Sequence, residues 1–231
     1  MILQAFKFTN VFLAKHFLNI FKISIFPVLF NILLIYWNKA YFRANLDTQS
    51  PIMTQDNLLT TLFSGLISLY VFSLLVQVVN DHYKKEKRTL LNYYFQAFYY
   101  LPNVFLASLI VGLAVAGGLM LFIVPGIYLL GRLLLVQLIV IVENKNFVES
   151  FLAGQDYAKG YSWTLSLAFL WLLCLFILIS IPFSSLIFSP LGEISSLWIM
   201  ASIVLALYNH TLAIYTYVFV YSLYLAVLQD K

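Results

Sequence analysis

Arg132 is the residue whose type and position most strongly indicate a chemical role, because its guanidinium lies inside a long apolar run. A charged side chain in the middle of a membrane span costs about 2.5–3.5 kcal/mol on insertion scales, so it needs compensation. The side chain could reach the headgroups at the membrane surface, pair with another span, or bind an anion within the bundle. Lipid phosphate is the natural anion, since guanidinium binds phosphate bidentately. Gln137, on the same run, would then be a second ligand.

Three more polar residues, Gln77, Asn209 and His210, also interrupt apolar runs. Hydrogen bonding between helices is the ordinary role of such side chains in a membrane. One alternative is a polar path that joins Gln77 and His210 to Arg132 and Gln137 and carries a solute or a lipid across the bundle. Another is intramembrane catalysis, for which His210 would need a hydroxyl or carboxylate within about 3.2 Å, inside a cavity.

A basic cluster follows the second apolar run directly. Its members are Lys84, Lys85, Lys87 and Arg88. Such clusters fix the orientation of a membrane protein, since basic residues stay on the cytoplasmic side. They also attract anionic lipid, and each charge near the surface contributes about 1 kcal/mol.

The sequence carries none of the short motifs that identify common enzymes. There is no His-Glu-x-x-His, no Gly-x-Ser-x-Gly, no phosphate-binding loop and no dinucleotide fingerprint. The single cysteine, Cys174, excludes a disulfide framework and a cysteine-based metal site. His16, His82 and His210 lie far apart in the chain. We therefore expect a protein without catalytic activity, metal or cofactor.

The composition identifies the class of protein that holds these residues. Of the 231 residues, 63% are hydrophobic and only 10% are charged. Soluble domains carry roughly 25% charged residues, so this chain is an integral membrane protein. Nucleic-acid binding would need a basic face with elements that stack on bases or enter a groove. The sequence shows none, so we expect no nucleic-acid partner.

Six apolar runs can cross a membrane, which takes about 20 helical residues each. We expect an all-α, polytopic bundle in one membrane domain over residues 1–231. Its spans lie at about 20–38, 58–79, 104–123, 127–142, 162–182 and 196–228. Val124-Pro125-Gly126 has turn chemistry and no polar loop beside it, which predicts a tight hairpin between the third and fourth spans.

Three segments beside the spans are amphipathic and predict helices that lie flat in the membrane interface. They cover residues 1–19, 88–100 and 143–160. Pro102 is expected to break the chain between the second of them and the third span. Gly160 is expected to end the third in the position of a C-terminal cap.

The distribution of basic residues predicts the orientation. With six spans and both termini inside, ten Lys and Arg residues face the cytoplasm and only Lys39 and Arg43 face outward. This bias is strong. It also places the three amphipathic segments on the cytoplasmic face, where anionic lipid would hold them.

The stretch from Val124 to Trp163 combines several short features. Val124-Pro125-Gly126-Ile127 opens a span that contains an Arg, and the residues from Val140 to Lys145 end this span. An amphipathic helix and Lys159-Gly160 follow. In this pattern the stretch resembles the YciC-like multi-pass inner-membrane proteins of bacteria. The pattern is also similar to the membrane domain fused to some glycerophosphodiester phosphodiesterases, whose catalytic barrel has no counterpart here. The resemblance implies an all-helical protein of the bacterial inner membrane and brings no activity with it.

These observations predict a non-enzymatic inner-membrane protein that supports envelope integrity. Its expected partners are membrane lipids, anionic ones in particular, or another membrane protein. A small transporter or flippase that uses the polar path is the alternative.

Overall fold

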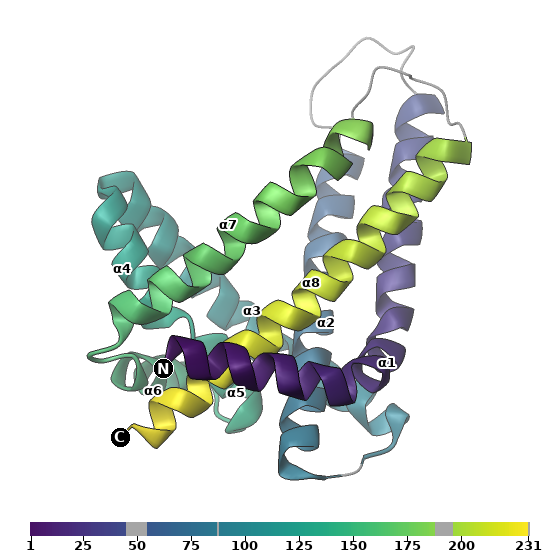
Figure 1. The fold of residues 1–231 in the computed structure, drawn as a ribbon. Coiled ribbons are helices and arrows are strands. Elements are labelled where there is room, and N and C mark those ends of the chain that lie inside the picture. The colour runs from purple at the N-terminus through teal and green to yellow at the C-terminus, as the bar shows by residue number, and fades with distance from the viewer. Residues whose placement is uncertain (45–54, 87, 188–195, 231) are drawn as a thin grey trace.

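The computed structural model describes residues 1–44, 55–86, 88–187 and 196–230, and these residues form helices and no strand (Figure 1). The helices are α1 (Ile2–Ala44), α2 (Gln55–Lys84), α3 (Leu90–Leu121), α4 (Ile123–Leu133), α5 (Val136–Val142), α6 (Phe147–Tyr157), α7 (Ser162–Ile187) and α8 (Ser196–Gln229). The all-α class expected from the sequence is therefore confirmed for the described part of the chain.

Five stretches of the described helices are long and apolar enough to cross a membrane. They are Ile2–Phe30, Thr61–Lys84, Leu90–Leu121, Ile123–Val142 and Ile203–Gln229. The pair α6 and α7 reaches the same criterion together, although the two helices meet at 100°. A chain with five or six such stretches fits a multi-pass membrane protein.

The expected break at Pro102 is absent, because α3 continues through this residue. Proline removes one backbone hydrogen bond, and a helix continues where neighbouring helices support it on both sides. Ala97 and Val104, before and after the proline, are both fully buried. Packing on the bundle thus outweighs the local preference for a break.

Residues 1–19 and 20–38, expected as a flat helix and a separate span, belong to the single helix α1. The helix contains Pro27 and is bent. Its first part lies across α8, and its later part turns away along the bundle (Figure 1). A proline permits such a bend because it leaves one carbonyl of the preceding turn without its usual donor.

The tight hairpin between the third and fourth spans is confirmed, but the chain reverses at Phe122, which links α3 to α4, and Val124-Pro125-Gly126, expected as the turn, lies within α4. Pro125 lies in the first turn of α4, where no amide donor is needed. A Cβ on Gly118 would lie 2.9 Å from the Gly126 Cα, so these two glycines allow the close approach. Gly160, expected as a cap, has a φ of +87° in the turn between α6 and α7.

The core of the bundle is formed around α2, where every residue from 71 to 81 is buried. This segment packs against α1, α3, α5 and α8. Helix α5 contributes the buried apolar residues 138–141, and the C-terminal half of α8 contributes the large buried rings of Phe219 and Tyr221. The core therefore lies where helices from both ends of the chain meet.

Polar side chains join α1 to α8 within this core. Ser24 Oγ lies 2.8 Å from His210 Nε2, and Thr9 Oγ1 lies 3.3 Å from Ser222 Oγ. These four residues are all buried. In an apolar medium such hydrogen bonds connect helices that have little hydrophobic driving force to associate.

Candidate functional site

The end of α2 positions the charged residues that follow the second span. Lys85 has a left-handed backbone with a φ of 60°. The Glu86 amide donates to the Asp81 carbonyl at 2.9 Å, and the Lys85 amide donates to the His82 carbonyl at 3.4 Å. This pair of bonds is a Schellman cap, which closes the helix and reverses the chain. The turn directs Lys84 and Lys85 outward, and both are exposed.

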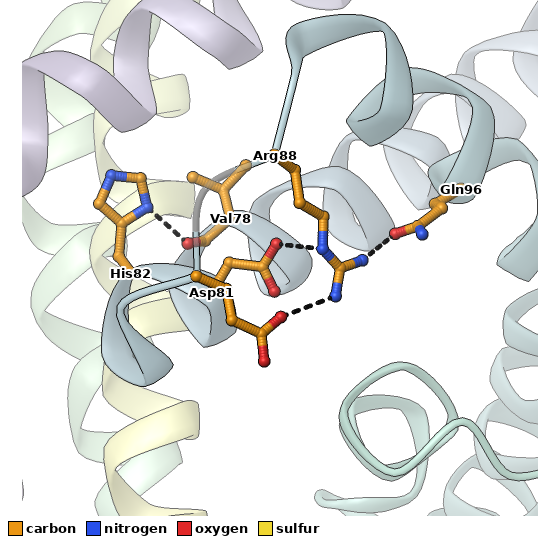
Figure 2. A network of polar contacts seen from close by, with 6 residues as sticks. Val78, Asp81, His82, Arg88 and Gln96 are labelled. Atoms are coloured by element: carbon orange, nitrogen blue, oxygen red, sulfur yellow. Dashed lines mark hydrogen bonds and ion pairs between the residues drawn. The ribbon is translucent and has the colours of Figure 1, made fainter.

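Arg88 forms the centre of a polar network at this turn (Figure 2). Its Nε lies 2.9 Å from an oxygen of Asp81, and its Nη2 lies 3.1 Å from Glu86 Oε2. Its third nitrogen donates to the side-chain oxygen of Gln96 on α3. Asp81 is only 1% exposed and has a further hydrogen bond with Tyr93. Arg88 therefore pairs with two carboxylates and connects α2 to α3.

His82 points away from this network on the same turn of α2 (Figure 2). Its Nδ1 lies 2.8 Å from the Val78 carbonyl oxygen. Because a carbonyl oxygen only accepts, Nδ1 carries a proton and donates. The other ring nitrogen, Nε2, remains available on the far side of the ring. Asp81 and Arg88 thus form an ion pair on one side of the end of α2, and His82 lies on the other side.

Lys84, Lys85 and Arg88, three members of the predicted basic cluster, therefore differ in their surroundings. Lys84 and Lys85 are exposed, whereas Arg88 is half-buried and paired. Lys87 lies outside the described residues. Among the described members of the cluster, Lys84 and Lys85 are exposed and are not among the ion pairs of the described residues, whereas Arg88 is not available in the same way.

Arg132 is half-buried on α4, and its Nη1 donates to the Tyr128 hydroxyl at 3.0 Å. The preceding residue, Gly131, is buried where α4 crosses α7. At this crossing Ser166 Oγ donates to the Ile127 carbonyl at 2.7 Å. Arg132 thus lies beside a close helix crossing, and binding of an anion there stays a prediction.

The other predicted polar residues lie in separate surroundings. Gln77 is 3% exposed in the core, and its side-chain amide has no hydrogen-bond partner among the described residues. Gln137 is half-buried on α5. Asn209 is exposed and lines a groove between α7 and α8, and neither Gln77, Gln137, Arg132 nor His210 lines that groove. Transport along a polar path stays a prediction.

His210 meets the distance criterion for a Ser–His pair, but its surroundings differ from those of a catalytic pair. Ser24 Oγ also lies 2.9 Å from the Ile20 carbonyl, which only accepts. With its one proton donated there, Ser24 accepts a hydrogen bond from Nε2 of His210. A nucleophile needs the opposite arrangement, in which the hydroxyl donates to the imidazole. Ser24 is fully buried and His210 is 5% exposed, so the contact resembles a bond between helices.

Glu143 is a polar centre that the analysis of the sequence did not identify as a site. It ends α5 and accepts hydrogen bonds from the Tyr224 hydroxyl at 2.7 Å and from Lys145 Nζ at 2.5 Å. The Tyr157 hydroxyl lies 3.4 Å away. Asn146 caps the following helix, since its side chain accepts from the Glu149 amide at 2.9 Å. Glu143 therefore fixes the turn between α5 and α6 against α8.

We expect Glu143 to make the stability of the protein depend on pH. Burial opposes its ionisation, but the hydrogen bonds from Lys145 and Tyr224 outweigh burial and lower its pKa below the ordinary 4.5. A lowered pKa stabilises the fold above the pKa of the unfolded chain, and this contribution is lost as the pH falls through the folded pKa. The detergent-solubilised protein should therefore lose thermal stability between about pH 5 and pH 3.

The matched control for this prediction is Glu149→Gln, since Glu149 is exposed. Glu143→Gln should flatten the dependence of the melting temperature on pH, whereas Glu149→Gln should leave it as in the wild type. Equal slopes for the wild type and Glu143→Gln would contradict the assignment.

No protein family, curated protein or solved structure matches this chain. Within the described residues, no three side chains of His, Cys, Asp or Glu are grouped as a metal site would require. The arrangement that remains for a function is the charged turn at the end of α2.

Proposed function

We propose that this chain is a non-enzymatic, six-span protein of the bacterial inner membrane that binds anionic lipid at its cytoplasmic face. Both termini lie in the cytoplasm in this proposal. The YciC-like pattern from Val124 to Trp163 supports the location, and the excess of basic residues on one side supports the orientation.

The observation that carries the lipid proposal is the combination of free cations and exposed apolar residues at the turn from α2 to α3. Lys84 and Lys85 are exposed, while the neighbouring acids are held by Arg88. Directly after the turn, Leu91, Phe95 and Phe98 are each more than 60% exposed on α3. Their spacing places them on one face of the helix.

This combination matches the chemistry of the membrane interface. An apolar helix face enters the boundary between headgroups and acyl chains, and adjacent lysines attract anionic headgroups. Support for envelope integrity would follow from this contact, because a protein that retains anionic lipid at one face anchors its cytoplasmic surface to the bilayer.

The proposal is tested by the lipids that remain with the intact protein after purification in mild detergent. Mass spectrometry should show phosphatidylglycerol or cardiolipin enriched over phosphatidylethanolamine, relative to the membrane of origin. In a Lys84→Gln/Lys85→Gln variant the enrichment should fall by about thirtyfold, since each charge contributes on the order of 1 kcal/mol. A Lys22→Gln/Lys159→Gln variant removes two other exposed charges and should retain it. A bound lipid composition equal to that of the membrane would overturn the proposal.

The same measurement applies to Arg132→Leu. If Arg132 also holds a lipid phosphate, the variant should lose part of the anionic lipid that the wild type retains. Unchanged lipid content would reject this role and leave the hydrogen bond to Tyr128 as the use of the guanidinium.

A further inference from the structure

A groove of about 410 Å³ lies between the first part of α1 and the end of α2. Its polar lining consists of Lys7, Lys15 and His16 from α1 and His82 from α2, together with Tyr83. No acidic side chain is among the lining residues in the described part of the chain. The groove therefore gathers nitrogen bases from two segments that are distant in sequence.

The two histidine rings meet across the groove. The centroids of His16 and His82 are 5.0 Å apart, and the rings are inclined at 70°. The Nδ1 of His82 donates to the Val78 carbonyl, so Nε2 is the ring nitrogen of His82 that faces the groove. Nε2 points away from the network of Asp81 and Arg88 (Figure 2).

The nearest carboxylates do not neutralise this groove. Asp81 and Glu86 both pair with Arg88, on the opposite side of the α2 terminus. Lys7 and Lys15 are exposed and are not among the ion pairs of the described residues. The two ammonium groups repel one another, and an anion bound between them would remove this repulsion.

The remaining walls of the groove are apolar. Phe8, Val11 and Phe12 line it beside the lysines. On the exposed face of α1, Leu3, Val11 and Leu18 are each more than half exposed. Cations interleaved with exposed large apolar side chains fit a ligand that has both a negative headgroup and a hydrocarbon part. Free phosphate would use only the cations.

We propose that this groove binds the phosphate of an anionic membrane lipid, with Lys7, Lys15 and the two histidines around the headgroup and Phe8, Val11 and Phe12 along the glycerol and upper acyl chains. The proposal rests on the proposed function and names a defined site for it, distinct from the exposed Lys84 and Lys85. Phosphate binds to such a site through charge-assisted hydrogen bonds from the ammonium groups of Lys7 and Lys15.

Native mass spectrometry of the intact protein in mild detergent tests the site. The protein is titrated with phosphatidylglycerol and, in parallel, with phosphatidylcholine of the same chain length. We expect the wild type to prefer phosphatidylglycerol, and Lys7→Gln/Lys15→Gln to bind it about thirtyfold more weakly, since two surface charges are removed. Lys7→Arg/Lys15→Arg should retain the preference. These side chains are exposed, so the variants are expected to fold.

The control is Lys22→Gln/Lys159→Gln, which removes two exposed charges outside the groove and should bind as the wild type does. In a second experiment, inorganic phosphate is added to the complex of the wild type with phosphatidylglycerol, at the same concentration as the lipid. Displacement of the lipid by inorganic phosphate would overturn the proposal of a lipid site, as would an unchanged preference in Lys7→Gln/Lys15→Gln. If anionic lipid still co-purifies with the wild type while the groove variants behave as the control does, the groove is excluded and the broader function stands.

Discussion

Replacement of Gly131 by alanine is expected to destabilise the protein by about 3 kcal/mol, in the upper range for overpacking. A Cβ at this position would lie 2.7 Å from the backbone amide of Ser166 and closer still to the Ser162 carbonyl oxygen. Backbone atoms of a helix cannot move away as a flexible side chain can. The new methyl group would therefore force α4 and α7 apart and break the hydrogen bond from Ser166 to the Ile127 carbonyl.

The control for this prediction is Gly117→Ala on α3, where a Cβ would meet no atom within 4 Å. Both variants replace a helical glycine by alanine, so they share the gain in helix propensity. Thermal unfolding in detergent can be monitored by the loss of the monodisperse peak in gel filtration. The melting temperature of Gly131→Ala should lie far below that of Gly117→Ala. Equal melting temperatures would show that the two helices do not cross at Gly131.

Replacement of Arg88 by methionine is expected to cost about 3 kcal/mol, because it leaves a buried carboxylate without its cation. Asp81 is almost fully buried, and Arg88 is its partner in the ion pair at 2.9 Å. The cost should appear in the free energy of unfolding measured in mixed micelles. The ion pair of Arg88 with Asp81 differs from that of Arg88 with Glu86. The Glu86 side chain is 50% exposed, so water can solvate its carboxylate when Arg88 is removed.

Two comparisons make the Arg88 prediction specific. Glu86→Gln should cost less than about 1 kcal/mol, as exposed ion pairs do. Asp81→Asn combined with Arg88→Met should recover much of the loss, since no buried charge remains. A cost for Arg88→Met no larger than that for Glu86→Gln would contradict the arrangement in Figure 2.

The long apolar runs made most of the helices predictable. The last run was expected at 196–228, and α8 covers Ser196–Gln229. The hairpin between the third and fourth spans followed from turn chemistry between two apolar runs, although the chain reverses at Phe122 and Val124-Pro125-Gly126 lies within α4. Pro102 was misleading because the sequence shows the lost hydrogen bond but not the helices that support α3 on both sides. Local preference is visible in a sequence, whereas tertiary support is not.

The candidate site was predictable only in part. The sequence pattern identified Lys84, Lys85, Lys87 and Arg88 as one basic cluster, but not that Arg88 is paired with Asp81 and Glu86. The different surroundings of the two lysines and of Arg88 depend on the left-handed backbone at Lys85. Lysine rarely adopts this conformation, so the sequence does not indicate the turn. His16 and His82 lie far apart in the chain and meet only because α1 packs against α2. Nothing in either local pattern indicates this meeting.

The contacts of α1 with α8 have a consequence for how the protein is made. The hydrogen bonds between Thr9 and Ser222 and between Ser24 and His210 join residues separated by 213 and 186 positions. During synthesis the first helix enters the bilayer long before its partner is translated, so its hydroxyls must bond to their own backbone until then. Assembly of the bundle therefore waits for the last helix, and a ribosome that stalls before α8 would leave an inserted but unclosed protein for quality-control proteases.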